Sequence, residues 1–186
     1  LEKQAASLGA TELGPETTFD LHQVKVLIVD DNATNRKVLR YQLSAWGVQV
    51  DEADSAAGAI AQLRHQYQQG QPYHLAILDM QMPDMDGEML GAQIKADAQL
   101  QTTQLIMMTS LNHWGGARQA LQLGFAAYLV KPVKQSRLLD SLQTTLAQIA
   151  LGVAPADPQL PTQPSPGKAI ALSSSPPNSS CSLGVG

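Results

Sequence analysis

Hydrophobic and polar positions follow two alternating patterns along the middle of the chain. Five short apolar runs are bounded by turn residues, which is typical of strands buried on one or both faces. We predict strands over residues 25–29, 48–53, 74–78, 105–108 and 127–130. The segments between these runs carry apolar residues at helical spacing, so five strands and five helices should follow one another in strict alternation.

The helical segments also carry start and stop residues. The first apolar face consists of Leu39, Leu43 and Trp46, and Gly47 is placed to end that helix in a left-handed cap. Ser55 should cap a helix that runs to about residue 69, and Asp86 one that runs to about residue 96. A short fourth helix is expected over 115–123, and the last helix has apolar positions Leu138, Leu142, Leu146 and Ile149.

This order of elements predicts the fold class. Strand followed by helix, repeated, requires right-handed crossovers and gives a parallel sheet with helices on both faces. We therefore expect an α/β domain with a doubly wound, five-stranded parallel sheet. In such sheets, ligands bind beyond the carboxyl ends of the strands, at the point where the strand order reverses.

Five polar side chains stand at the carboxyl ends of the predicted strands. Asp30 and Asp31 follow the first strand, Asp79 the third, Thr109 the fourth and Lys131 the fifth. The carboxyl ends of parallel strands meet at one edge of a sheet. Three acids, a hydroxyl and a lysine should therefore share one rim.

Those side chains predict a particular chemistry. Three close carboxylates repel one another, so at neutral pH either one is protonated or a cation neutralises them. An oxygen-rich site without His or Cys favours a hard divalent ion, and Mg²⁺ suits a site that handles phosphate, with Asp30 and Asp31 as ligands. Asp79 could then attack phosphorus as a nucleophile, with Lys131 stabilising the oxygens and Thr109 donating a hydrogen bond to the new phosphoryl group.

Composition limits the size of the domain and the kind of partner. The chain has 186 residues, of which 44% are hydrophobic and 15% charged, enough for one core but hardly for two. We place that domain at residues 24–151. The net charge of -4 provides no basic field for a phosphate backbone, so we expect protein partners and no nucleic acid.

The two ends of the chain differ from its middle in composition and in hydrophobic periodicity. Residues 1–23 lack sustained periodicity and are interpreted as a linker with at most a short ordered piece, and residues 152–186 form a Pro/Ser-rich flexible tail. The absence of an initiator methionine suggests an excised fragment. With a single cysteine and no apolar stretch near the roughly 20 residues needed to cross a bilayer, we expect a reducing, cytoplasmic location without direct membrane contact.

These residues together resemble one family, the receiver domain of two-component response regulators, from about residue 25 to residue 148. Asp30-Asp31 matches the acidic pair, Asp79 the phosphoacceptor before a Met-Pro-Asp-Met-Asp-Gly loop, Thr109 the switch hydroxyl, and Lys131-Pro132 the lysine with its commonly cis proline bond. The resemblance implies a flavodoxin-like strand order 2-1-3-4-5. It also implies that the Gln81 backbone carbonyl completes the Mg²⁺ ligands and that Tyr128 is an aromatic switch.

A finer resemblance concerns the subtype. The segments 30–36, 108–111 and 124–132 look like receivers built into hybrid sensor histidine kinases. This implies a histidine kinase domain and a histidine phosphotransfer domain as partners, within a parent protein that could be tethered to a membrane. For this chain alone we favour a monomer.

Other readings of the same residues stay open. The chain could be a constitutive protein-interaction module that has the fold without physiological phosphorylation, although such a module would not need three repelling carboxylates. It could also be a Mg²⁺-dependent phosphatase with an aspartyl nucleophile, but those enzymes carry the nucleophile on the first strand under a cap domain. Thr109 could be an ordinary strand-end residue, and Tyr128 an ordinary half-buried tyrosine.

Overall fold

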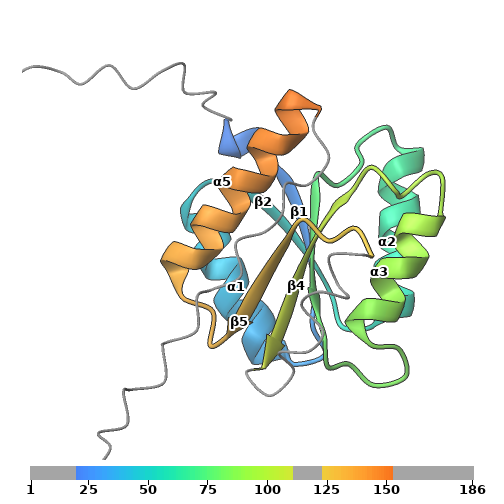
Figure 1. Ribbon diagram of the computed structural model, residues 1–186, viewed down its shortest axis with the longest axis horizontal. Coiled ribbons are helices and arrows are strands. Elements are labelled where there is room, and N and C mark those ends of the chain that lie inside the picture. The colour runs from blue at the N-terminus through green and yellow to red at the C-terminus, as the bar shows by residue number, and fades with distance from the viewer. Residues whose placement is uncertain (1–19, 111–122, 153–186) are drawn as a thin grey trace, which may run out of the picture.

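A five-stranded parallel sheet forms the centre of the molecule (Figure 1). The structure, a computed structural model, describes residues 20–110 and 123–152. The strands are β1 (Lys25–Val29), β2 (Gln49–Ala53), β3 (Leu75–Asp79), β4 (Gln104–Ser110) and β5 (Ala127–Lys131). Their order in the sheet is β2-β1-β3-β4-β5, so the predicted doubly wound fold and its strand order 2-1-3-4-5 are confirmed.

Helices cover both faces of this sheet. They are α1 (Ala33–Ala45), α2 (Ala56–Gln68), α3 (Gly87–Ala96) and α5 (Gln135–Leu151). In Figure 1, α1 and α5 lie on one face and α2 and α3 on the other. The strand order reverses between β1 and β3, which places the carboxyl ends of these two strands at the crevice where ligands are expected.

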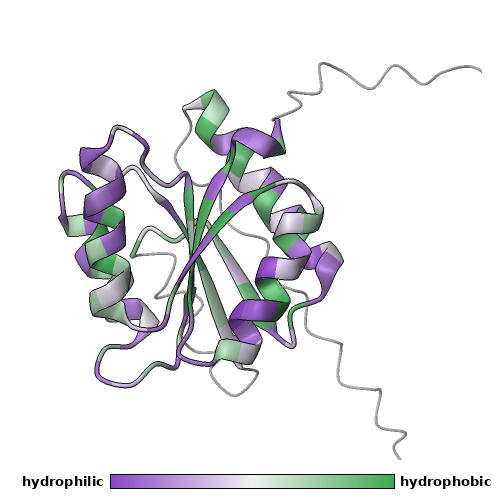
Figure 2. Ribbon diagram, turned by 180° about the vertical axis from the view of Figure 1, so that it is seen from behind, coloured by the Kyte–Doolittle hydropathy of each residue, from purple (hydrophilic) through white to green (hydrophobic). Residues whose placement is uncertain are grey.

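Each face of the sheet has its own apolar core. Leu27, Ala76 and Met107 belong to the cluster under α2 and α3, whereas Ile28 and Ile77 belong to the cluster under α1 and α5. Neighbouring residues of one strand thus serve opposite cores, as the alternation of a strand requires. Figure 2 shows the result, with apolar strands inside and polar outer surfaces on the helices. The strands that carry the carboxyl-end residues are thus packed between two apolar layers.

The predicted helix signals act as expected. The Ser55 hydroxyl accepts a hydrogen bond from the Gly58 backbone at 3.3 Å, and the Asp86 carboxylate accepts one from the Met89 backbone at 2.8 Å. Gly47 follows α1 with a φ of 84°, the left-handed conformation that glycine adopts without strain. All three predicted start and stop residues are therefore confirmed.

Several element bounds differ from the prediction by one or two residues. β3 includes Asp79 and β5 includes Lys131, because both residues continue the sheet pairing beyond the apolar runs. β4 extends to Ser110, so Thr109 lies inside this strand and pairs in register with Val130. The helix predicted over 115–123 lies outside the described residues, apart from its last residue.

A short piece of the predicted N-terminal linker is attached to the domain. Leu21–Gln23 forms a 3-10 turn, in which the Asp20 side chain accepts a hydrogen bond from the His22 backbone. Leu21 packs against the core under α1 and α5. The Gln49 side chain donates a hydrogen bond to the His22 carbonyl at 2.9 Å. Within the described ranges, none of the helices combines the length and apolar character that a membrane crossing requires.

Candidate functional site

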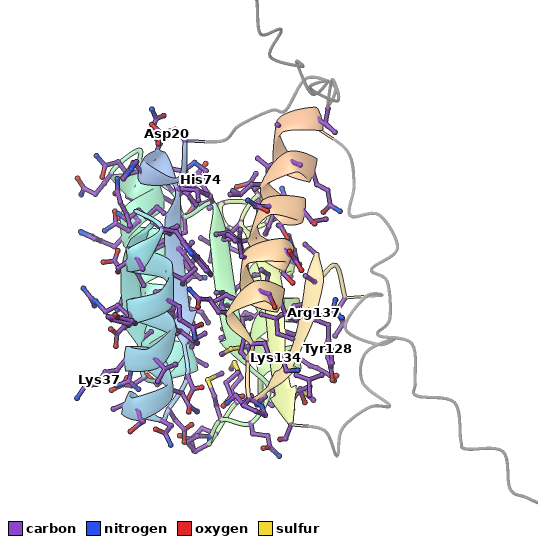
Figure 3. All side chains as sticks on the ribbon, turned by 90° about the vertical axis from the view of Figure 1, so that its left-hand side faces the viewer. Asp20, Lys37, His74, Tyr128, Lys134 and Arg137 are labelled. Atoms are coloured by element: carbon purple, nitrogen blue, oxygen red, sulfur yellow. The ribbon has the colours of Figure 1, made fainter. Side chains whose placement is uncertain are left out.

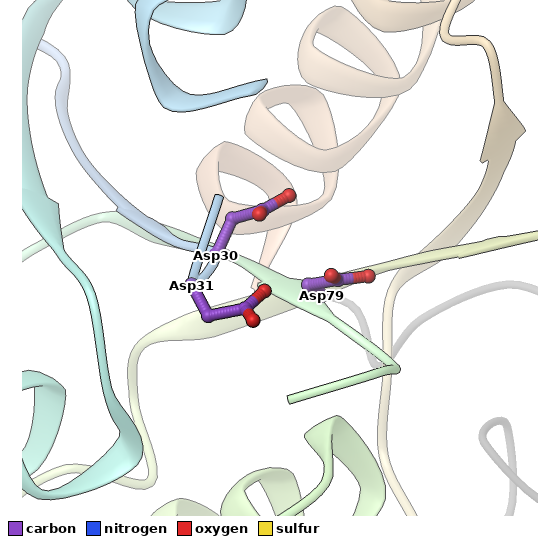
Figure 4. A group of neighbouring side chains, drawn as sticks. All are labelled: Asp30, Asp31 and Asp79. Atoms are coloured by element: carbon purple, nitrogen blue, oxygen red, sulfur yellow. The ribbon is translucent and has the colours of Figure 1, made fainter. Parts of the chain in front are cut away.

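Three aspartates meet at the carboxyl edge of the sheet (Figure 4). Asp30 and Asp31 directly follow β1, and Asp79 is the last residue of β3, the strand beside β1. One carboxylate oxygen from each residue lies within 4.8 Å of those of the other two. The sheet therefore brings together the three acids that the sequence placed on one rim.

Lys131 joins this group from the far edge of the sheet. Its ammonium lies 2.8 Å from Asp79 Oδ1 and 3.0 Å from Asp30 Oδ2. The peptide bond that follows, between Lys131 and Pro132, is cis, as the resemblance implied. Asp79 and Lys131 both alternate onto the α1–α5 face of their strands, since Ile77 and Leu129 two residues earlier belong to that core. Strand alternation thus directs the acid and the base to the same side.

Asp30 is held by a network of donors. Its side chain is fully buried and accepts hydrogen bonds from the Asn32 backbone at 2.8 Å and from the Asn35 amide at 3.1 and 3.3 Å, besides the bond from Lys131. A buried carboxylate requires such partners, because an unpaired charge removed from water is costly. Asp31, in contrast, is exposed, so its carboxylate can exchange ligands with solvent.

The electrostatics of the pair Asp79–Lys131 reflect burial and charge together. Burial raises the pKa of Asp79 above its ordinary value, although the hydrogen bond and charge of Lys131 and a bond from the Gln81 backbone oppose this effect. Burial by itself would lower the pKa of Lys131, but its bonds to Asp79 and Asp30 outweigh this and raise it. Lys131 therefore stays charged at neutral pH, and its charge opposes the effect of burial on the pKa of Asp79.

The donor set fits a hard divalent cation. All three groups offer carboxylate oxygens, and a cluster within 4.8 Å can surround an ion whose bonds to oxygen are about 2.0–2.1 Å, as for Mg²⁺. Such an ion would relieve the repulsion among the acids, and Asp31 leaves an open side towards solvent. No contact tests the Gln81 carbonyl, which stays a predicted ligand. The Gln81 side chain accepts a hydrogen bond from Ser110 at 2.9 Å.

Thr109 and Tyr128 alternate onto the α2–α3 face of their strands, and Thr109 follows Met108, the residue of β4 that pairs with Asp79 at the carboxyl edge. Thr109 is 1% exposed, and its hydroxyl donates a long, 3.4 Å hydrogen bond to the Ser110 carbonyl. Tyr128 lies on the edge strand β5 (Figure 3). It is half-buried, pairs in register with Met107 and packs against the α2–α3 core. The sheet brings both residues to the same face, and their switching roles stay predictions.

The loop after Asp79 is fixed by close packing with α3. The Gly87 backbone donates a hydrogen bond to the Met80 carbonyl at 3.2 Å, and a side-chain carbon at Gly87 would lie only 2.5 Å from the Asp79 carbonyl oxygen. The glycine at the start of α3 thus allows the helix to approach the end of β3 directly. This explains in physical terms why the Asp-Gly end of the loop suits this position.

Two residues of α1 reach the rim without having been predicted to act there. Asn35 binds the Asp30 carboxylate, and Arg36 binds the Asp30 and Asp31 carbonyls at 2.6 and 3.1 Å. Both residues lie in the segment 30–36, whose resemblance to hybrid-kinase receivers implied no role for either of them. Their position in the first turn of the helix after the acidic pair could have indicated that they face back towards it.

Curated relatives share this region with the chain. The transcriptional regulatory protein ZraR of Salmonella typhimurium is 31% identical over 125 residues, which cover 67% of this chain and 27% of ZraR. The osmosensing histidine protein kinase SLN1 of Saccharomyces cerevisiae is 27% identical over 62% of this chain and 9% of the kinase. The hybrid signal transduction histidine kinase L of Dictyostelium discoideum is 30% identical over 64% of this chain and 7% of the kinase. The chain spans only a small part of each of these relatives.

Solved structures and a family model agree with these relatives. A response regulator receiver protein from Pseudomonas putida is 30% identical, with a TM-score of 0.58 over 64% of this chain and 94% of its own. A putative two-component system response regulator/GGDEF domain protein is 26% identical, with a TM-score of 0.64 over 70% of this chain and 51% of its own. The model of the response regulator receiver domain matches residues 26–143, which contain the whole acidic rim. The chain therefore belongs to the response regulator receiver family.

Proposed function

We propose that this receiver domain accepts a phosphoryl group on Asp79 in a two-component phosphorelay. The observation that carries this proposal is the position of the Asp79 carboxylate, 3% exposed, 2.8 Å from the Lys131 ammonium and beside two further carboxylates. A strand-end acid held against a lysine and a potential cation site has the parts that aspartyl phosphorylation requires.

The chain's own residues would act as follows. A carboxylate oxygen of Asp79 attacks the phosphorus of a phosphohistidine, so that an O–P bond forms while the P–N bond breaks. The imidazole nitrogen keeps the electron pair of the broken bond and takes up a proton. Lys131 stabilises the negative oxygens of the phosphoryl group, and the Thr109 hydroxyl donates a hydrogen bond to it.

Asp30, Asp31 and Asp79 would hold Mg²⁺, with the Gln81 carbonyl as the proposed additional ligand. Bound there, the ion would supply positive charge to the oxygens of the transferring phosphoryl group. The asymmetry of the three acids supports this division of work, because Asp30 is buried and Asp31 exposed. Asp30 would supply a ligand oxygen held in place by hydrogen bonds, and Asp31 would supply one that solvent can reach.

The partners would be histidine-containing modules. Similarity to SLN1 and to the Dictyostelium hybrid kinase supports a place within a hybrid sensor histidine kinase, with a kinase domain as donor and a histidine phosphotransfer domain as a further acceptor. Such a parent could be membrane-tethered while this domain works in the cytoplasm. We propose a monomeric receiver that does not bind nucleic acid.

The test is intact mass after incubation with acetyl phosphate, with and without Mg²⁺. We expect one added phosphoryl group that requires both Mg²⁺ and Asp79, and none on Asp79→Asn. Asp84→Asn is the matched control. Asp84 is exposed in the same loop and has a φ of 68°, a conformation that asparagine tolerates well, so this variant should be phosphorylated like the unaltered chain.

Two outcomes would contradict the proposal. A folded chain that binds Mg²⁺ but gains no phosphoryl group would favour the constitutive interaction module. Phosphorylation that persists in Asp79→Asn but disappears in another aspartate variant would place the acceptor elsewhere. Either result would redirect the search from the kinase to a binding partner or to a second site.

A further inference from the structure

The guanidinium of Arg36 binds the backbone of the acidic pair, Asp30 and Asp31. Nη1 of Arg36, in the first turn of α1, donates hydrogen bonds to the Asp30 carbonyl at 2.6 Å and to the Asp31 carbonyl at 3.1 Å. The Arg36 side chain is only 16% exposed. One nitrogen thus fixes both successive peptide groups that carry two of the three candidate metal ligands.

Glu52 holds this guanidinium in place from β2. Its Oε2 accepts a hydrogen bond from Arg36 Nε at 3.3 Å, and its Oε1 accepts one from Arg40 Nη1 at 2.9 Å. Glu52 is itself placed by the sheet, since it pairs in register with Ile28, two residues before Asp30. The planar guanidinium therefore has a defined orientation, with Nε towards β2 and Nη1 towards the rim.

The Asp31 side chain depends on this arrangement more than the other acids do. Asp30 and Asp79 are buried and bonded directly to Lys131. Within the part of the chain that the structure describes, no hydrogen bond or ion pair holds the Asp31 carboxylate, whereas its carbonyl is bound by Arg36. The direction of the Asp31 carboxylate is therefore set by its backbone, and that backbone is held by Arg36.

We propose that Arg36, oriented by Glu52, is a positioning residue that fixes the Asp30–Asp31 backbone so that Asp31 faces Asp79 across the metal site. This inference rests on the proposed function, because it assumes that the three carboxylates bind Mg²⁺. Residues that orient metal ligands typically contribute about 10- to 100-fold to metal affinity. Arg36 donates to the Asp30 and Asp31 carbonyls rather than to a candidate ligand oxygen, so it would act through the position of the Asp30–Asp31 backbone.

The test compares Mg²⁺ affinity by isothermal titration calorimetry in the unaltered chain and four variants. Arg36→Ala removes the guanidinium, and Arg36→Lys keeps the charge without the planar fork. Glu52→Gln loosens the guanidinium and leaves its bonds to the acidic pair, which guards against failure of Arg36→Ala to fold. Arg40→Ala is the matched control, because Arg40 binds the same glutamate, is 54% exposed and does not contact the acidic pair.

We expect Arg36→Ala to weaken Mg²⁺ binding about tenfold or more, and Glu52→Gln to weaken it less. Arg36→Lys should remain clearly weaker than the unaltered chain, and Arg40→Ala should lie within about twofold of it. The initial rate of phosphorylation by acetyl phosphate should recover in Arg36→Ala at saturating Mg²⁺. That recovery separates positioning from a general loss of structure.

A second readout needs no metal. In the metal-free protein, the carbonyl ¹³C resonances of Asp30 and Asp31 should shift in Arg36→Ala and stay unchanged in Arg40→Ala, because Arg36 bonds to these carbonyls whereas Arg40 bonds to Glu52. This measurement stands even if phosphorylation is absent. It shows directly whether the guanidinium holds the acidic pair in solution.

Three results would overturn the inference. Folded Arg36→Ala with Mg²⁺ affinity within about twofold of the unaltered chain would remove the positioning role, as would full restoration by Arg36→Lys, which would assign the effect to charge alone. In both cases the proposed function survives. An unaltered chain that binds no Mg²⁺ would overturn the proposed metal site and this inference together.

Discussion

At the rim, one ammonium group lies within hydrogen-bond distance of two carboxylates. Lys131 contacts both Asp30 and Asp79, and the two carboxylates are almost completely buried. The lysine therefore does in the metal-free protein part of what a divalent cation would do: it neutralises acids that cannot reach water. Its side chain is 26% exposed, so under the proposed function an incoming phosphoryl group could reach it.

Replacing Lys131 should reveal this role. Lys131→Met leaves two buried carboxylates without their cation, and we expect a loss of about 3 kcal/mol in the free energy of unfolding, at the low end for a broken buried pair. Mg²⁺ should restore stability more in this variant than in the unaltered chain. Urea denaturation in EDTA and in Mg²⁺ measures both effects, and an equal response to Mg²⁺ in the two proteins would contradict the argument.

His74 lies away from the rim, and we expect it to make the free energy of unfolding depend on pH. Its Nδ1 accepts a hydrogen bond from the Lys25 backbone at 3.2 Å, and burial lowers the pKa of His74. The unfolded chain therefore binds a proton at higher pH than the folded one, so the free energy of unfolding should fall as pH drops below the ordinary histidine pKa of about 6.5.

His74→Asn keeps an acceptor for the Lys25 backbone and removes the titrating group. The difference in unfolding free energy between pH 7.5 and pH 5.5 should then be smaller than in the unaltered chain, as measured by urea denaturation at both pH values. Other titrating groups contribute equally to both proteins. An unchanged difference would show that His74 does not titrate differently on folding.

At the scale of elements, α3 is held unusually close to the strands it covers. Gly87 faces the Asp79 carbonyl, and one helical turn later Gly91 lies against the ring of the fully buried Phe125. The helix that follows the loop after Asp79 is thereby fixed to β3 at one point and to the segment before β5 at the other. Any added atom at either glycine has to displace backbone or a packed ring.

Gly91→Ala should therefore destabilise the domain by about 1–3 kcal/mol, despite the better helix propensity of alanine. Phe125→Leu reduces the bulk opposite Gly91, so the penalty of Gly91→Ala should be smaller in that background. A double-mutant cycle by urea denaturation measures the coupling. Additive effects of the two substitutions would contradict a direct contact between Gly91 and Phe125.

At the scale of the whole molecule, the two apolar cores and the rim make one unit, and the N-terminal turn is part of it. Leu21 packs with Trp46 and Ile149 against the same core, and His22 lies directly over Gly47. Figure 3 places Asp20 and His74 at one end of the molecule, with Lys37 and Lys134 towards the other. The attached turn therefore lies away from the acids.

A chain that begins at Asp20 should be more stable than one that begins at Val24. We expect a difference of about 1–2 kcal/mol, because the shorter chain loses the packing of Leu21 and the bond from Gln49 to the His22 carbonyl. Both chains should bind Mg²⁺ equally well, since the turn is far from the rim. Thermal and urea denaturation test the first point, and equal stability would mean that the turn does not dock in solution.

The sequence by itself determined the five strands, the helices in the described part of the chain, the fold class and the group of residues at the rim. Apolar runs, Ser55, Asp86 and Gly47 are local signals, and a parallel α/β sheet necessarily gathers the carboxyl ends of its strands. The predicted ends of β3 and β5 fell one residue short, because the polar residues Asp79 and Lys131 continue the strand pairing. Backbone pairing does not depend on hydropathy, so periodicity could not show it.

Only the tertiary structure decided which partner each rim residue has. Lys131 bonds to Asp30, which is 101 residues away, and Arg36 turns back from α1 to hold the acidic pair while Glu52 of another strand orients it. The burial that raises the pKa of Asp79 likewise comes from segments far apart in the chain. Side-chain direction and desolvation depend on packing between such distant segments, and no local pattern contains that information.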